Sequence, residues 1–239
     1  YRYNVALNTW TALAAAPQRM AANETFVYYN GDFYQFGGTV YGTAALNCNS
    51  TAYSTVYKYN VAGNSWSALN AYGTGSTGGV VTLMNGMAAT VGSYIYTYGG
   101  VHGYVVGVTA GTQSTTLLKY DPAADTYTTI NTAGPATNVG MGHMKSYGTK
   151  LYLFRPNSND ATIASSSKIW IFDTANEAAG WSEMSGVDVS GGMDWTLDRY
   201  DGWFAVGSGS IFLGGGRQYS NAGVNQTTTN FQTLDKIRY

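Results

Sequence analysis

A short aromatic unit that recurs along the chain most constrains its fold. Residues 1–13 read YRYNVALNTWTAL, and residues 57–69 read almost the same, YKYNVAGNSWSAL. Looser versions follow at 118–130 (LKYDPAADTYTTI) and 169–184 (IWIFDTANEAAGWSEM). The steps between units, measured at the second aromatic residue, are 56, 61 and 52 residues. A unit that returns at this period indicates a repeat architecture built from one supersecondary element.

A second unit alternates with the first. It reads GDFYQFGG at 31–38, GSYIYTYGG at 92–100, GTKLYLFRP at 148–156 and GSIFLGGG at 209–216. Each is an apolar and aromatic run that follows a turn, and three of the four end in Gly-Gly. Runs of this composition bounded by Gly and Asn predict β-strands. No segment keeps a 3.6-residue period, so we expect almost no helix.

Each period supplies four strands, and the first complete period shows them well. They are TFVYY (25–29), FYQFGG (33–38), TVYKY (55–59) and SWSAL (65–69), joined as an antiparallel meander. One such sheet cannot bury both of its faces, whereas a ring of sheets can. The sequence therefore predicts an all-β fold, a β-propeller of four-stranded antiparallel blades.

The pattern resembles the kelch repeat over essentially the whole chain. Gly-Gly closes the second strand, an aromatic residue follows about 20 residues later, and Trp comes about seven residues after that. PQRMA at 17–21 also resembles the Pro-x-Arg opening of kelch repeats. Two departures are Arg155-Pro156, which replaces Gly-Gly in the third unit, and Tyr127, which replaces Trp. The resemblance implies a kelch-type propeller.

We expect one domain over 1–239. Its units fall at approximately 14–69, 70–130, 131–184 and 185–239, with 1–13 as a partial or closing blade. Two ring arrangements are compatible with these units. The N-terminal strands close a four-bladed ring with the C-terminal sheet, or the four to five visible units belong to a larger ring.

Composition limits the partners and the location. Charged residues are 10% of the chain and the net charge is −1, against about 25% charged residues in ordinary soluble domains. Without a basic run, nucleic-acid binding is not expected. No apolar stretch is long enough to predict membrane insertion. The neutral surface, rich in Tyr and hydroxyl groups, favours an extracellular location or one on a virion or cell surface.

Long loops on one face of the propeller are the predicted binding region. In an up-down sheet, the connections after the second and fourth strands leave on the same face, and these are the long ones. Functional groups concentrate on such loops. The side chains expected there are Arg19, Tyr41, His102, Tyr104, Arg155, Trp195, Arg217 and Tyr219. Arg and Tyr suit a carboxylate, a sugar or a protein loop, although solvated loop residues would look the same.

Few residues suggest metal or cofactor chemistry. Asp194 and Asp198 could supply two of the oxygen ligands that Ca²⁺ requires, and they are weak candidates. We predict no other cofactor. The single Cys48 excludes an intrachain disulfide. Three sequons, at Asn23, Asn49 and Asn225, permit glycosylation and show no more than that.

The leading functional expectation is a non-catalytic structural and interaction module, so enzyme activity is not favoured. It would bind neighbouring protein subunits or a glycan through the long-loop face. The alternative is a carbohydrate-active or oxidative enzyme domain with its site at the axial mouth of the propeller. A cluster there that includes His102 or His143 would favour the enzyme. An intracellular kelch adaptor that binds a peptide is a third possibility, and the low charge counts against it.

Overall fold

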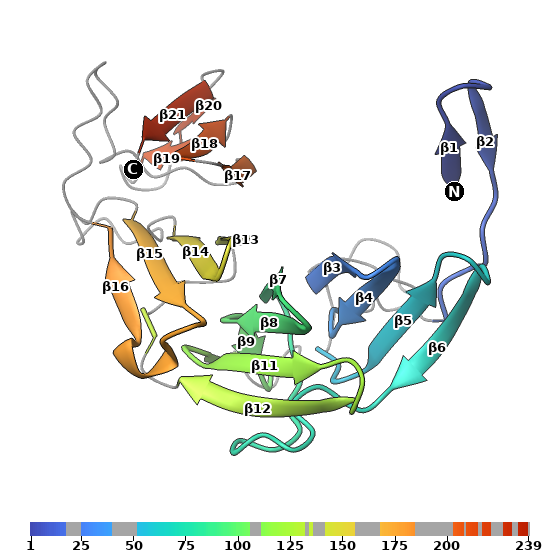
Figure 1. Cartoon of the computed structure of the whole chain (residues 1–239), viewed down its shortest axis with the longest axis horizontal. Helices are drawn as coiled ribbons and strands as arrows, with labels where there is room; N and C mark the ends of the chain where they lie inside the picture. The colour runs from blue at the N-terminus through green and yellow to red at the C-terminus, as the bar shows by residue number, and fades with distance from the viewer. Residues whose placement is uncertain are drawn as a thin grey trace.

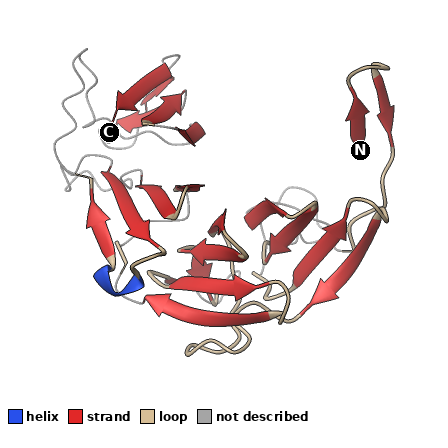
Figure 2. Cartoon of the chain, in the orientation of Figure 1, coloured by secondary structure: helices blue, strands red, loops and turns tan. Residues whose placement is uncertain are grey.

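The computed structural model is built from β-sheets that follow one another along an arc (Figure 1). It describes residues 1–17, 25–39, 52–105, 111–131, 134–135, 142–155, 168–184, 203–207, 209–214, 217–220, 227–230 and 234–238. In these ranges one 3-10 turn, η1 (Glu177–Ala179), is the only helical element (Figure 2). No helix in the described part of the chain is long and apolar enough to span a membrane.

The first complete sheet, here called the first blade, contains four antiparallel strands in sequence order. They are β3 (Thr25–Tyr29), β4 (Asp32–Phe36), β5 (Val56–Asn60) and β6 (Ser65–Leu69). Asn30 and Gly31 join β3 to β4 with φ angles of 46° and 91°. Positive φ at both turn positions matches the right-handed twist of the paired strands. These strands lie within a residue or two of their predicted positions.

The second and third blades repeat this four-stranded order. The second blade consists of β7 (Met87–Val91), β8 (Tyr94–Tyr98), β11 (Leu117–Asp121) and β12 (Thr126–Asn131). The third consists of β13 (His143–Tyr147), β14 (Lys150–Arg155), β15 (Lys168–Asp173) and β16 (Trp181–Glu183). A two-stranded pair, β9 (Val101–His102) with β10 (Thr112–Gln113), lies in the connection between β8 and β11.

The two ends of the arc carry smaller sheets (Figure 1). At one end, β1 (Arg2–Asn4) and β2 (Thr9–Thr11) form the N-terminal hairpin. At the other end is a three-stranded sheet of β17 (Trp203–Gly207), β18 (Ser210–Gly214) and β21 (Leu234–Arg238). The pair β19 (Arg217–Ser220) and β20 (Thr227–Asn230) lies beside it. Among the described strands, β1 and β2 pair only with each other.

The hydrophobic core lies between neighbouring sheets, as the propeller prediction requires. Between the first and second blades, Phe36 is fully buried and packs edge-on against Tyr120 and Tyr127, with ring centroids 5.7 and 6.4 Å away. Aromatic pairs of this geometry add stability beyond the area they bury. Separate clusters join the second blade to the third, and the third to the β17 sheet. The all-β propeller prediction is confirmed.

A hydrogen-bonded turn fastens each of the first two blades to the segment before it. In the second blade, Tyr120 donates its hydroxyl to Asp125 Oδ1 at 2.7 Å, and the Asn70 amide donates to Asp125 Oδ2 at 2.8 Å. In the first blade, Asn64 Oδ1 accepts from the Tyr59 hydroxyl at 2.7 Å and from the Ala14 amide at 2.8 Å. The turn of one sheet therefore holds the chain that leaves the preceding one.

Candidate functional site

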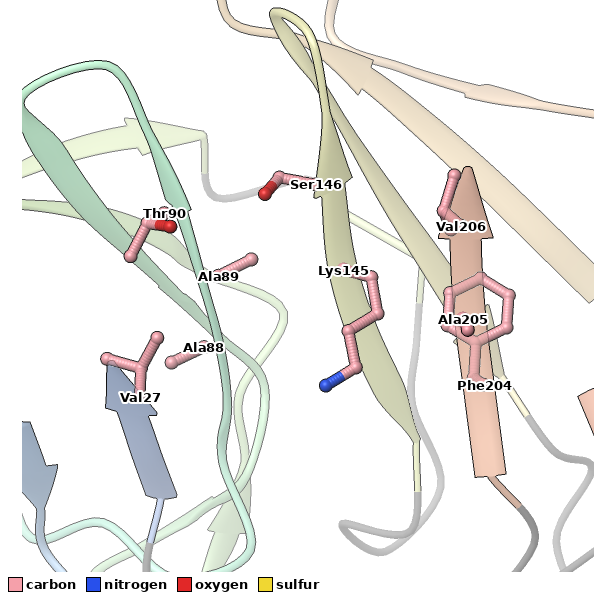
Figure 3. A pocket seen from close by; sticks show the side chains of 9 residues that line it. All are labelled: Val27, Ala88, Ala89, Thr90, Lys145, Ser146, Phe204, Ala205 and Val206. Carbon is pink, nitrogen blue, oxygen red and sulfur yellow. The ribbon is translucent and has the colours of Figure 1, made fainter. Parts of the chain in front are cut away.

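The first strands of four successive sheets line a common cavity. β3, β7, β13 and β17 are neighbours around the inside of the arc. The space between them measures about 430 Å³. Figure 3 shows the side chains that line it, which are Val27, Ala88, Ala89, Thr90, Lys145, Ser146, Phe204, Ala205 and Val206. This space, called the axial cavity below, is the candidate functional site.

Small side chains on the inner strands keep the axial cavity open. Its lining from β7 is Ala88, Ala89 and Thr90, and Ala205 occupies the middle of the lining from β17. A strand carries side chains alternately on its two faces. The large residues of these sheets, such as Phe36 and Tyr120, lie instead in the clusters between blades. Much of the aromatic bulk thus lies between blades, while alanine, serine and threonine make up more than half of the cavity lining.

Lys145 gives the axial cavity its charge. It is the one charged side chain among the nine residues that line the cavity, and it extends from β13 toward Val27 and Ala88 (Figure 3). Lys145 forms no ion pair with any residue that the structure describes. Thr90 and Ser146 add hydroxyl groups to the same lining. Lys145 is exposed to solvent within this space, so its ammonium group can attract an anion that enters the cavity.

The described lining is suited to hold an acidic, hydroxylated molecule. Lys145 can bind a carboxylate as a point charge, and hydroxyl groups can donate to or accept from a sugar. Val27 and Phe204 offer apolar contact. Over the same nine residues no carboxylate is present. These residues therefore supply binding, and a proton-transfer group has to come from elsewhere around the mouth.

His143 lies on the same side of β13 as Lys145. The two residues are two positions apart on one strand, so their side chains leave the same face. His143 is the first residue of β13, where the connection from the second blade enters, and its ring stacks 6.5 Å from that of Phe154. His143 is not among the nine residues that line the axial cavity.

Two of the predicted site residues lie away from the axial lining. His102 is in β9, where its ring meets the edge of Tyr72 at 6.1 Å. Burial lowers the pKa of His102 below its ordinary value. The backbone oxygen of Tyr104 accepts from the Ala52 amide at 3.1 Å, which ties two long connections together. Neither residue lines the axial cavity.

The other predicted residues are placed only in part. Arg155 was expected just after the strand, whereas it is the last residue of β14 and pairs with Lys168. The strand continues because Arg-Pro replaces the Gly-Gly that ends the equivalent strand elsewhere. Arg217 and Tyr219 lie in β19. The following predicted residues fall outside the described residues: Arg19, Tyr41, Asp194, Trp195 and Asp198.

The described residues contain no group of three or more His, Cys, Asp or Glu side chains arranged to hold a metal ion. The calcium site stays a prediction, because Asp194 and Asp198 lie outside the described residues. The ring of Arg and Tyr also stays a prediction, because several of its members lie outside them. The residue that sequence reasoning missed is Lys145. Its signal was the single Lys inside HMKSY at 143–147, the stretch that forms the innermost strand of the third blade.

Comparison with known proteins gives a partial match in sequence. No protein-family model matches the chain. N-acetylneuraminate epimerases from three Escherichia coli strains are each 33% identical to it over 130 residues. The match covers 49% of this chain and 33% of each epimerase. The aligned part is thus about a third of the relatives' length.

Comparison with solved structures covers almost the whole chain. The structure of YjhT superposes with a TM-score of 0.66 at 18% sequence identity, over 95% of this chain and 72% of that chain. At this identity the likeness concerns the fold alone. The order of four-stranded sheets along the chain is therefore a propeller arrangement found in a solved protein.

These matches correct the leading functional expectation. The curated relatives are epimerases, so the prediction of a non-catalytic structural module is wrong, and the enzyme alternative fits better. Propeller sites are assembled from single residues of several blades, and such residues leave no motif in one stretch of sequence. The chain is a β-propeller, and 49% of its length is similar in sequence to the N-acetylneuraminate epimerases.

Proposed function

We propose that this chain is the sugar-binding part of a carbohydrate-active enzyme whose substrate is an acidic sugar of the N-acetylneuraminate class. The observation that carries the proposal is Lys145, an unpaired cation in the axial cavity. The 33% identity to the epimerases supports the same substrate class. The repeat pattern supports a further proposal, that the propeller is of the kelch type.

The axial cavity matches the parts of such a sugar. N-acetylneuraminate carries a carboxylate, an N-acetyl group and several hydroxyl groups. Lys145 would hold the carboxylate, Thr90 and Ser146 would bond hydroxyl groups, and Val27 with Phe204 would contact the acetyl methyl. The cavity volume of about 430 Å³ lies in the usual range of small-molecule sites, roughly 300–1,000 Å³.

An epimerisation also requires a group that moves a proton, because one stereocentre is inverted. His143 is suited to that role, since imidazole changes charge near neutral pH. It shares the side of β13 that carries Lys145 and is two residues away from it, although it is not among the nine lining residues. In this arrangement Lys145 would fix the substrate by its charge, and His143 would take a proton from the substrate and return it before the product leaves, so that no net proton is gained or lost.

Binding of N-acetylneuraminate to the 239-residue chain tests the proposal. Calorimetry with Lys145→Met should show binding at least about tenfold weaker, because a hydrogen bond to a charged group is lost. Lys150→Met is the matched control, since Lys150 begins the next strand outside the cavity and should bind normally. Equal affinities for the two variants would contradict the role of the axial cavity.

Two other expectations continue as proposals. The low charge and the abundance of hydroxyl groups support a location outside the cytosol. Arg155, at the end of β14, and Arg217, at the start of β19, would contact parts of a glycan that extend beyond the axial cavity. Subcellular fractionation would test the location. Binding of sialylated glycans longer than one sugar, compared with the free sugar, would test the contact with extended glycans.

A further inference from the structure

A second cavity lies on the outer part of the second blade, away from the axis. It measures about 240 Å³ and shares no lining residue with the axial cavity. One wall is formed by His102, Leu118 and Thr129, from β9, β11 and β12. The opposite wall is the loop of residues 76–81, in the connection between β6 and β7.

Hydrogen bonds fix the loop that forms this wall. The Val81 amide donates to the Tyr72 oxygen at 3.0 Å and closes the loop at its base. Tyr72 is 1% exposed, and its hydroxyl lies 3.0 Å from Thr97 Oγ1. The Tyr127 amide donates to the Thr74 oxygen at 2.8 Å and holds the loop to β12. The cavity is therefore formed before any ligand arrives, as is usual for small-molecule sites.

His102 brings unused hydrogen-bonding capacity to this second cavity. Its Nε2 is enclosed and has no partner, and the ring makes no hydrogen bond with any residue in the described ranges. Burial lowers the pKa of His102, so the ring is neutral at pH 7. A neutral imidazole offers one donor and one acceptor. His102 lines the cavity, so a ligand bound there can contact its ring.

Hydroxyl groups surround the imidazole. Thr129 Oγ1 accepts from the Thr77 amide at 3.1 Å, which leaves the hydroxyl proton of Thr129 to donate elsewhere. Thr116 adds a second hydroxyl, and Leu118 adds an apolar surface. Among the described residues that line the cavity, His102 is the only one with an acidic or basic side chain. A charged ligand would therefore lose its hydration without finding a counter-charge.

We propose that this second cavity binds a small, neutral, polyhydroxylated ligand of monosaccharide size. The ligand would bond the His102 ring and the hydroxyl groups of Thr116 and Thr129, and its apolar face would lie on Leu118. The volume of about 240 Å³ is below the range of roughly 300–1,000 Å³ for larger ligands. The second cavity shares no lining residue with the axial cavity, so a test of this proposal is independent of the proposed enzyme function.

Imidazole NMR can test this proposal directly, because the chain contains only two histidines. His143→Gln assigns the two ring signals. Methyl α-D-glucopyranoside is the probe, since it lacks the carboxylate that Lys145 would bind. We expect its titration to shift the His102 signals saturably, with a millimolar Kd, while the His143 signals stay in place. Absence of a saturable His102 shift up to about 100 mM would overturn the proposal.

Two variants place the effect in the cavity. Gly78→Leu should abolish the shift, because Gly78 lines the cavity and a Cβ there meets no atom within 4 Å, so the leucine enters open space. Gly207→Leu is the matched control, with equally open surroundings outside the cavity, and should bind normally. His102→Ala should weaken binding about tenfold, measured by ligand-observed NMR. Unchanged binding by Gly78→Leu would refute the site.

Discussion

Two copies of the repeated unit fold alike and yet have different surroundings. In the hairpin β1–β2 the rings of Tyr3 and Trp10 lie 5.0 Å apart, and in β5–β6 those of Tyr59 and Trp66 also lie 5.0 Å apart. The tyrosine hydroxyl bonds the asparagine five residues later in both, at 2.6 and 2.7 Å. The local hairpin is thus the same object twice.

The contacts beyond the hairpin differ. Trp10 is 69% exposed, whereas Trp66 is half-buried and donates its Nε1 proton to the Ala14 oxygen at 3.1 Å. β5 pairs with β4 on its other side, while β1 pairs with no described strand except β2. The comparison teaches that one sequence can specify a hairpin, and that a neighbouring sheet is needed to make it part of a core.

The largest expected difference comes from the tyrosine of the third copy. Tyr120 is fully buried between the first and second blades. Tyr120→Ala should lower the free energy of unfolding by about 3–5 kcal/mol, because it leaves a cavity there. Tyr3→Ala should cost less than about 1 kcal/mol, because Tyr3 is partly exposed. Urea denaturation measures both, and equal losses would show that the two hairpins are packed alike in solution.

The second-largest effect should be a loss of folding stability at alkaline pH, caused by the buried Tyr72 in the core between the first and second blades. Burial raises the pKa of Tyr72 to about 12, from 10.0 in the unfolded chain. Below pH 10 the tyrosine is protonated in both states, and as the pH rises toward 12 only the unfolded state loses the proton. Stability should therefore fall by about 2–3 kcal/mol over that window for this residue.

Tyr72→Phe should make the loss of stability with pH shallower, because the titrating group is gone. Its stability at pH 7 should be slightly lower, since the hydrogen bond to Thr97 is lost. Urea midpoints at a series of pH values between 8 and 11.5 give the slope for both proteins. A variant slope as steep as that of the parent chain would contradict the assignment to Tyr72.

The turn asparagines sharpen the comparison further. Asn64 has a φ of 47° and Asn8 a φ of 50°. Asn64→Ala removes bonds to Tyr59 and to the Ala14 amide, whereas Asn8→Ala removes only the bond from Tyr3 among the described contacts. We expect Asn64→Ala to cost about 1 kcal/mol more, the usual value of one net hydrogen bond. Thermal unfolding would show it, and a larger effect at Asn8 would reverse the argument.

The smallest effect should belong to the exposed tryptophan. Trp10→Ser should change the free energy of unfolding by about 0.5 kcal/mol or less, as is usual for an exposed position. Trp66→Phe should lower stability more, because the bond to Ala14 is lost. Acrylamide quenching offers a second measurement, since Trp10 should be the more accessible ring. Protection of Trp10 from acrylamide would mean that something covers the hairpin in solution.

Strands and turns were predictable from sequence because their causes are local. SWSAL at 65–69 was predicted as a strand and is β6 at the same residues. Asp121 starts its turn through an equally local contact, with its carboxylate accepting from the Ala123 amide at 2.8 Å. The third unit differs from the others because Arg155-Pro156 replaces Gly-Gly, and there the end of the strand differs from the prediction. Without Gly-Gly, β14 runs on to Arg155.

The candidate site was predictable only in outline. The sequence indicated a binding region on the long loops of one propeller face, whereas the cavity is lined by the inner strands. Lys145 and Thr90 are 55 positions apart in the sequence, and neither belongs to a motif. They line one cavity because β13 and β7 are neighbours around the axis. The comparison with the epimerases then reversed the expected class of function.

The sequence by itself determined the repeat, the strand order within each blade and the tyrosine-to-asparagine turns. These depend on side-chain alternation and on contacts between residues a few positions apart. Tertiary structure decided which copy of the repeat is buried, how the inner strands leave a cavity, and that Lys145 stands in it. Those outcomes depend on the contact of one sheet with the next, and no single repeat contains that contact.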